Sequence, residues 1–312
     1  MYTFIYLFKI YKIYRYIFYI IMSDISCQLM GGLGNQLFQI FTTIAYGMKY
    51  NREVFFPYSE TLEFGISRDT YWNSFLSSLK HMTTDNPNSS YSNDQLSIFT
   101  RYNENGHHYT EIPNLQNKRI SLFGYFQSPL YFEKETQDIF ALMNLSESKQ
   151  KIRDEYPEYF TPGSTLISMH FRLGDYKTKQ NHHPIMPCSY YDKSLNHILL
   201  NCKIYGPVNV LYFCEEEDNH IILPVIAKLS GTYSGFNFIK VDDTIEDWKQ
   251  LLLMSNCHHN IIANSSFSWW GAYFNNNSDK IVCYPSLWFG PALMKNNVSD
   301  MTPHNWTKID VR

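Results

Sequence analysis

Short apolar segments alternate with helix-like segments from Asp24 onward, and this alternation restricts the fold more than any other feature of the chain. The predicted strands lie at 25–30, 53–57, 119–128, 165–172, 208–214, 236–241, 260–264 and 280–285. Amphipathic segments such as 37–50 and 190–202 separate them and are predicted to be helices. Strands that alternate with helices form parallel sheets with right-handed crossovers. The sequence therefore predicts an α/β fold.

The segment PEYFTPGS at 157–164 interrupts this alternation with two prolines and a glycine. Such breakers mark a connection, and a length of 312 residues suits two domains of ~150 residues each. We therefore expect Rossmann-like domains at 23–160 and 161–312, after a separate extension at 1–22. Within the first domain, the polar segment 83–117 has no clear period and is predicted to be a surface insertion or long loop.

The composition excludes several classes of protein. Hydrophobic residues make up 44% of the chain and charged residues 18%, which supplies ample material for a folded core. The formal net charge is −3, so there is no basic excess to bind a nucleic-acid backbone. The six cysteines are scattered without a C-x-x-C pair, which favours reduced thiols over a disulfide framework or a zinc site. We expect a cytoplasmic enzyme without a nucleic-acid partner.

The extension at 1–22 holds nine aromatic residues, three basic residues and no acid. Lys9, Lys12 and Arg15 interrupt its apolar character, whereas a spanning helix needs about 20 mostly apolar residues. A transmembrane helix is therefore not predicted. In the favoured interpretation Met22 is the working start and the extension is an appendage. In the alternative, the extension is an interfacial helix that associates the protein with a membrane.

The segment GGLGNQ at 31–36 follows a predicted strand and opens a predicted helix. Glycines let backbone N–H groups approach a ligand, and a helix N-terminus favours an anion. The segment matches neither GxxxxGK[ST] nor GxGxxG, so a tight strand–helix turn is the alternative. The amides after the glycines are well placed to bond sugar hydroxyls or a diphosphate. The candidate substrate-binding residues are Gly32, Gly34, Asn35 and Gln36.

The segment HFRLGDY at 170–176 comes at the carboxyl end of a predicted strand, where α/β folds bind ligands. His170 and Arg172 alternate with Phe171 and therefore share a face. An arginine there can bind a diphosphate through two nitrogens and neutralise a leaving group without a metal. We expect Arg172 to be catalytic and Asp175 to be a weaker catalytic candidate. The alternative is a simple ion pair between these two residues.

Several hydroxyl side chains follow the predicted strand at 260–264. Serines at a strand-to-helix junction supply hydroxyl and N–H groups that suit phosphate oxygens. The candidate binding residues are Ser265, Ser266, Phe267 and Ser268. For Trp269 and Trp270, core packing is favoured over ligand stacking. The acidic run at 215–218 suggests a metal site, but acids also complement a helix N-terminus, so we interpret it as a solvated helix start and predict no metal site.

Three segments together resemble one family. They are GGLGNQLFQ (31–39), HFRLGDY (170–176) and LLLMSNCHHNIIANSSFSWWGAYF (251–274), with KIVCYPSLWF (280–289) after the third. GYFQSPLYF (124–132) and the adjacent Tyr190 and Tyr191 also match. These segments resemble the α-1,2-fucosyltransferases of glycosyltransferase family 11, and the likeness runs from about Ile25 to Phe289. The third segment is long and specific.

The resemblance implies a GT-B-type fold, in which two Rossmann-type domains face a central cleft. It implies GDP-β-L-fucose as the donor substrate, inversion at the anomeric carbon, transfer to O2 of a galactose-containing acceptor glycan, and neither a metal nor a cofactor. Carried over by position, Arg172 contacts the β-phosphate, His170 lies beside the guanosine and Asn35 faces the donor across the cleft. The serines that hold the diphosphate map to Ser265, Ser266 and Ser268.

Two positions depart from the family pattern. Leu173 stands where a second arginine is usual, and Gln250 stands where relatives carry an acid that bonds guanine. The nearest acids are Asp247 and Glu246, and Asp247 is our candidate for that contact. We expect donor affinity or nucleotide choice to differ in consequence.

Two alternative functions stay open. One is a related glycosyltransferase with a different donor or acceptor, and the other is a catalytically silent module that binds a sugar nucleotide or a glycan. Retention of Arg172 and of the serine segment favours an enzyme. The acceptor is expected to contact mainly the first domain, including 83–117. The sequence does not identify the general base.

Overall fold

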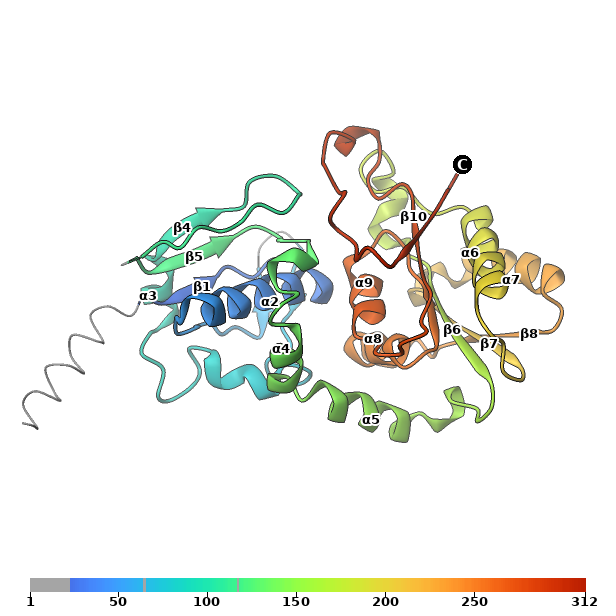
Figure 1. The fold of residues 1–312 in the computed structure, drawn as a ribbon, viewed down its shortest axis with the longest axis horizontal. Coiled ribbons are helices and arrows are strands. Elements are labelled where there is room, and N and C mark those ends of the chain that lie inside the picture. Colours follow the sequence, from blue (N-terminus) through green and yellow to red (C-terminus); the bar gives the residue numbers. More distant parts are fainter. Residues whose placement is uncertain (1–22, 64–65, 117) are drawn as a thin grey trace, which may run out of the picture. The chain divides into compact units, whose positions relative to one another are not determined.

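The computed structural model describes residues 23–63, 66–116 and 118–312, so the predictions for the extension at 1–22 lie outside the described residues (Figure 1). The described chain forms two compact units. The first contains the described residues up to Gly31, Phe38–Asn105 and Tyr109–Met143; the second contains Gly32–Leu37, Gly106–His108 and Asn144–Arg312. The connection at 157–164 leads from α5 (Leu145–Glu155) to β6 (Thr165–His170) within the second unit.

A parallel sheet forms the centre of the first unit. Its strands are β1 (Ile25–Cys27), β5 (Ile120–Phe123) and β4 (Thr100–Asn103), in the order β1-β5-β4. Parallel bridges join Ile25 to Val54 and Phe56 to Thr83, so the predicted strand at 53–57 pairs only at single residues. A short antiparallel pair, β2 (Thr61–Leu62) and β3 (Arg68–Asp69), lies apart from this sheet.

Helices α2 (Leu33–Tyr50), α3 (Asn93–Ser97) and α4 (Thr136–Leu142) belong wholly or mainly to the first unit. The apolar face of α2 supplies its core, because Phe38 and Phe41 both pack against Phe132, with ring centroids 6.0 and 5.4 Å apart. All three rings are buried. The apolar residues whose spacing predicts this helix therefore form the face that packs into the core of the first unit.

The prediction of a loop across 83–117 is wrong in part, because this segment contains α3 and β4. Ser92 and Gln95 form a capping box at the start of α3, in which each side chain accepts from the other residue's backbone N–H. Strand β4 has the sequence TRYN, is largely exposed and forms an edge of the sheet. A strand without a buried face shows no apolar alternation, so the sequence pattern does not reveal it.

The second unit is built on a six-stranded parallel sheet in the order β11-β10-β9-β6-β7-β8. Its strands are β6, β7 (Val208–Phe213), β8 (Phe236–Lys240), β9 (His259–Ile261), β10 (Val282–Pro285) and β11 (Thr307–Ile309). Its helices include α5, α6 (Cys188–Asn201), α7 (Asn219–Thr232), α8 (Asp247–Ser255) and α9 (Ser266–Tyr273). The α/β prediction is confirmed, and β11 is the strand of this sheet that lies outside the predicted segments.

The strand order places a reversal beside β6. After β6 the chain adds β7 and β8 on one side, and it then returns to add β9, β10 and β11 on the other. Ligands of open α/β sheets bind beyond the carboxyl ends of the strands at such a reversal. The residues that follow His170 in β6 and Ile261 in β9 therefore occupy the favoured position for a site.

Core packing is confirmed for Trp269 and Trp270, whose side chains are buried. The indole nitrogen of Trp269 donates to the carbonyl oxygen of Met301 at 2.9 Å, which satisfies the polar group of a buried ring. All six cysteines are free thiols. Among the residues described, no helix is both long enough and apolar enough to cross a bilayer.

Candidate functional site

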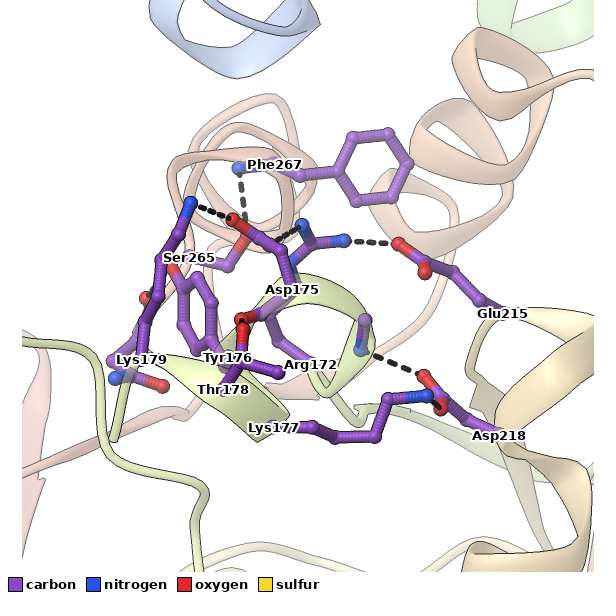
Figure 2. A network of polar contacts seen from close by, with 12 residues as sticks. Arg172, Asp175, Tyr176, Lys177, Thr178, Lys179, Glu215, Asp218, Ser265 and Phe267 are labelled. Carbon is purple, nitrogen blue, oxygen red and sulfur yellow. Dashed lines mark hydrogen bonds and ion pairs between the residues drawn. The ribbon is translucent and has the colours of Figure 1, made fainter. Parts of the chain in front are cut away.

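Arg172 lies at the centre of a polar network just beyond the carboxyl end of β6 (Figure 2). One terminal nitrogen of its guanidinium donates to Asp175 Oδ1 at 2.7 Å, and the other donates to a carboxylate oxygen of Glu215, which follows β7. The guanidinium carbon also lies 5.2 Å from the centroid of the Tyr176 ring. The ion pair between Arg172 and Asp175 that the sequence left as an alternative is therefore present. It occurs together with a second carboxylate.

A tight turn holds this network in place. Gly174, the first residue of the 3-10 turn η4 (Gly174–Thr178), has φ +40°, a conformation that favours glycine. A Cβ atom added there would lie 2.6 Å from Glu215 Oε2. The Gly174 N–H donates to Asp218 Oδ2 at 2.8 Å, and Lys177 Nζ donates to Asp218 Oδ1 at 2.6 Å. Asp218 thus joins the turn to the start of α7.

The interpretation of the acidic run at 215–218 as a solvated helix start is wrong for Asp218, which is completely buried. Glu215 is exposed, as expected, but it pairs with Arg172. Oxygens of Glu215, Glu217 and Asp218 lie within 4.8 Å of one another. However, both Asp218 oxygens already accept hydrogen bonds from protein groups. In this structure Glu215 and Asp218 orient the Arg172 guanidinium, the Lys177 ammonium group and the Gly174 N–H.

His170, the last residue of β6, is buried beside the network. Its ring centroid lies 5.6 Å from that of Phe267, and its carbonyl oxygen accepts a hydrogen bond from the Tyr191 hydroxyl at 3.1 Å. Burial, with a smaller contribution from nearby Arg172, lowers the pKa of His170 to about 3, so the imidazole is neutral at neutral pH. Within the described chain, its Nδ1 atom has no hydrogen-bond partner. A buried polar atom of this kind is suited to a ligand.

Helix α9 begins next to His170. Ser265 caps it, because its hydroxyl accepts from the Phe267 N–H at 3.3 Å. Ser266 Oγ donates to Asn35 Oδ1 at 2.7 Å. Ser268 is buried and its hydroxyl donates to the Ser265 carbonyl oxygen at 3.4 Å, so this side chain is turned back onto its own helix. The groups left at the start of the helix are Ser265, Ser266 and the Phe267 N–H.

The turn GGLGNQ meets this helix start, and all of its residues after Gly31 belong to the second unit. A Cβ atom at Gly34 would lie 2.4 Å from the Ser266 carbonyl carbon, and Trp270 Nε1 donates to the Gly34 carbonyl oxygen at 2.9 Å. Gly34 therefore permits a close approach of two backbones. Gly32 has open space where a Cβ would stand, and Gln36 is buried.

The structure brings together most, though not all, of the predicted residues. Asp247 is exposed at the start of α8, where its carboxylate accepts from the Trp248 N–H at 2.7 Å, and it is not one of the ion-pair partners of Arg172. Gln250 donates to the Ile245 carbonyl oxygen at 2.8 Å. The sequence interpretation missed Glu215 as a partner of Arg172. Its position directly after a buried strand of the parallel sheet was the available signal.

The electrostatics of the network keep Arg172 charged. Burial opposes the charge of the guanidinium, but Glu215, Tyr176 and Asp175 outweigh it and raise the pKa of Arg172. Burial acts to raise the pKa of the Asp175 carboxyl, but Lys179 and Arg172 outweigh this effect and lower it. The site therefore contains a permanent guanidinium, a helix N-terminus and a neutral imidazole, groups that together suit a nucleoside diphosphate.

Two α/β units, each built on a parallel sheet, with a guanidinium and a helix N-terminus at the strand reversal of the second sheet, are what is expected of a glycosyltransferase that uses a nucleotide-sugar donor. The family model of glycosyl transferase family 11 matches residues 25–310, and the chain belongs to that family. The resemblance and the GT-B-like fold class drawn from the sequence are thereby confirmed.

Several known proteins are similar to this chain. The chain is 25% identical over 306 residues to the α-1,2-colitosyltransferase of Escherichia coli, covering 93% of this chain and 100% of that protein. It is 28% identical over 197 residues to the O-antigen biosynthesis glycosyltransferase WbnK of Escherichia coli, covering 60% of each, so this match spans less than two thirds of that relative. Among solved structures, the family 9 glycosyl transferase of Veillonella parvula is 10% identical, with a TM-score of 0.49, and covers 93% of this chain and 87% of that one.

Proposed function

We propose that this protein transfers L-fucose from GDP-β-L-fucose to O2 of a galactose-type residue in a glycan, with inversion at the anomeric carbon. The observation that carries the proposal is the position of Arg172, just beyond the carboxyl end of β6 and beside His170, with the start of α9 next to that histidine. A guanidinium and a helix N-terminus in this position suit the two phosphates of the donor.

In this proposal Arg172 is the principal catalytic residue. As the bond between C1 and the β-phosphate oxygen breaks, negative charge accumulates on the phosphate. A guanidinium that donates to that oxygen stabilises the charge more in the transition state than in the ground state, and so raises kcat. Asp175, which accepts from one terminal nitrogen of the guanidinium, acts as a positioning residue. Arg172 and the N–H groups of α9 perform the neutralisation for which other transferases use a metal.

The remaining candidate residues bind the donor in this proposal. The neutral ring of His170 offers its unpartnered Nδ1 atom as an acceptor beside the guanosine. The start of α9, with Ser265 and Ser266, binds the diphosphate, and Asn35 orients Ser266 through their hydrogen bond. Ser268 stabilises the helix start.

A second candidate function is colitosyl transfer, because the relative that is covered along its full length is named as an α-1,2-colitosyltransferase. Colitose is L-fucose without the 3-hydroxyl group. The same diphosphate site would serve either donor, so the two functions differ only in how the sugar is recognised.

The test is transfer by the purified full chain from GDP-L-fucose and from GDP-colitose to a panel of β-galactosides, with and without EDTA, together with GDP binding by calorimetry. We expect α-1,2-fucosylated product, unaffected by EDTA and abolished by Arg172→Ala. Preference for GDP-colitose would favour the second candidate. GDP binding without any transfer would identify a silent binding module, and absence of GDP binding would contradict every version of the proposal.

A further inference from the structure

The C-terminal end of α9 is bound by two lysine ammonium groups of the second unit. Lys149 Nζ, from α5, donates to the Phe274 carbonyl oxygen at 2.8 Å. Lys280 Nζ, from the segment before β10, donates to the Ala272 carbonyl oxygen at 2.9 Å and to that of Asn275. The last carbonyl groups of a helix carry its partial negative charge. Both cations therefore lie against the negative end of the helix whose opposite end is proposed to bind the diphosphate.

Neither lysine has a carboxylate partner in the described part of the chain. Lys149 is only 7% exposed, and its second acceptor is the neutral amide oxygen of Asn276, at 3.0 Å. Asp279, which precedes Lys280 in the sequence, is exposed and accepts from the Ser278 hydroxyl at 3.3 Å. Buried lysines are normally paired with an acid. This end of α9 thus holds two positive charges that are compensated by carbonyl and amide oxygens.

Side-chain amides fix the segments that carry these groups. The Asn275 amide donates to the Cys257 carbonyl oxygen at 2.9 Å and to Asn260 Oδ1 at 2.8 Å. The Asn256 amide donates to the Lys149 carbonyl oxygen at 3.1 Å, which joins α5 to the end of α8. The backbone after α9 and the backbone of α5 are therefore both held by residues that lie between α8 and β9. The length of α9 then sets how far the lysines lie from its first turn.

The other titratable groups beside the lysines do not cancel their charge. Arg153, on the exposed side of α5, adds a further positive charge that acts on Lys149. Burial raises the pKa of the Cys257 thiol to about 12 and lowers the pKa of both histidines at 258–259, so these groups are neutral at pH 7. Burial lowers the pKa of Lys149 and of Lys280 to about 8. Both lysines are therefore mostly protonated at pH 7 and mostly neutral at pH 9.

We infer that Lys149 and Lys280 strengthen the binding of the donor diphosphate by acting through α9. The inference rests on the proposed function. Two positive charges at the negative end of the helix offset its partial negative charge and make the potential at its first turn, where Ser265 and Ser266 lie, more positive. A diphosphate at that turn is stabilised without touching either lysine. The lysines are thus not catalytic residues, and they support the anion site from the far end of its helix.

The separation is short enough for a measurable effect. Helix α9 has eight residues, and a rise of 1.5 Å per residue places its two ends ~12 Å apart. At an effective dielectric constant of ~20, one pair of unit charges at this separation changes a binding constant about tenfold. Salt reduces this effect, although less for buried charges than for exposed ones. We therefore expect each lysine to contribute about three- to tenfold to the affinity for GDP.

The first test measures GDP binding by calorimetry at pH 7 in Lys149→Met and Lys280→Met, which replace each lysine by a neutral side chain of similar length. We expect the Kd for GDP to rise about three- to tenfold in each variant, with folding checked by a melting curve. Lys280→Arg keeps the charge and should keep the wild-type affinity. The matched control is Lys151→Met, which removes an exposed lysine from the same helix α5 and should change Kd by less than about twofold. Wild-type affinity in both folded methionine variants would overturn the inference.

The same binding measurement at pH 9 separates an electrostatic role from a structural one. The wild-type affinity for GDP should fall between pH 7 and pH 9, because the lysines lose the protons that favour the anion. The ratio of the two Kd values should be roughly threefold smaller in each methionine variant, and the titration of GDP itself is common to all the proteins and cancels. Equal ratios in the wild type and both variants would overturn the inference.

A measurement on the wild-type chain does not depend on the folding of a methionine variant. The lysine side chains are labelled with carbon-13 and titrated by NMR with and without GDP, and the two signals are assigned by their loss in Lys149→Arg and Lys280→Arg. We expect GDP to raise the pKa of both lysines, because a bound anion stabilises the protonated form; no change would overturn the inference. Failure of the wild type to bind GDP at all would instead refute the proposed function, so the two failures are distinguished by the wild-type titration.

Discussion

The Nζ atom of Lys177 lies 2.6 Å from Oδ1 of Asp218, a carboxylate that is completely buried in the second unit. The other oxygen of this carboxylate accepts the Gly174 N–H. A buried carboxylate is stable only when such partners replace its water. The pair therefore fixes the turn that places Arg172, although neither Lys177 nor Asp218 contacts the guanidinium.

We expect Asp218→Asn to lower the free energy of unfolding by about 1.5–3 kcal/mol, because it removes the charge of a buried carboxylate that accepts two hydrogen bonds. Urea unfolding of the purified chain measures this. The control is Glu217→Gln in the same acidic run, whose side chain is exposed and should change stability by less than about 0.5 kcal/mol. Equal effects of the two substitutions would show that Asp218 does not hold the turn.

Arg172→Ala should reduce kcat at least ~10²-fold, comparable to the loss of one oxyanion donor. Arg172→Lys should recover little of this, since a lysine cannot bond the diphosphate and Asp175 through one planar fork. Leu173 supplies no second cation. Steady-state kinetics with a melting curve for each variant tests the prediction, and Arg153→Lys on the exposed face of α5 is the matched control. Near-normal turnover in folded Arg172→Ala would remove Arg172 from the mechanism.

Glu215→Gln should tighten the binding of GDP. Glu215 pairs with the guanidinium that we propose for the diphosphate, so its charge competes with the ligand. A partly exposed pair of this kind contributes ~1 kcal/mol or less, which corresponds to a decrease in Kd of up to about fivefold. Calorimetry with GDP measures this change in Kd. The control is Glu216→Gln, which changes an exposed neighbouring residue. Weaker binding would instead make Glu215 a necessary support for Arg172.

Gly34→Ala should destabilise the chain by about 1–3 kcal/mol, because its Cβ would overlap the Ser266 backbone and one of the two helices would have to shift. Gly32→Ala is the internal control, since nothing lies within 4 Å of a Cβ there. It should leave stability unchanged or raise it by up to ~1 kcal/mol. Thermal and urea unfolding distinguish the two, and equal effects would argue against the close approach at Gly34.

Stability should fall as the pH is lowered below about 6.5. Burial lowers the pKa of His170 to about 3 and that of His259 to about 4. The unfolded chain therefore binds protons that the folded chain does not, and each histidine contributes a loss of up to ~1.4 kcal/mol per pH unit from about pH 6 down to its folded pKa. Urea unfolding at pH 7 and pH 5 measures this. The loss should be smaller in His170→Asn, and a stability independent of pH would contradict it.

The sequence by itself determined the class of fold and the position of the main chemistry in the chain. Apolar runs such as 165–172 and 208–214 are long enough to indicate strands that are buried on both faces. Motifs after such strands, with Arg172 and Ser265 among them, could be assigned to a ligand site because strand carboxyl ends meet at one edge of a parallel sheet. The edge strand β4 escaped prediction, since an exposed polar strand carries no such pattern.

Only the tertiary structure decided which distant residues meet. Glu215 reaches Arg172, Asp218 reaches Gly174, and Ser266 reaches Asn35. In the sequence, an acidic residue within a run of four acids is expected to be exposed to solvent. Burial and partner are properties of the folded arrangement, because they depend on strand order and on backbone approaches that local periodicity does not encode.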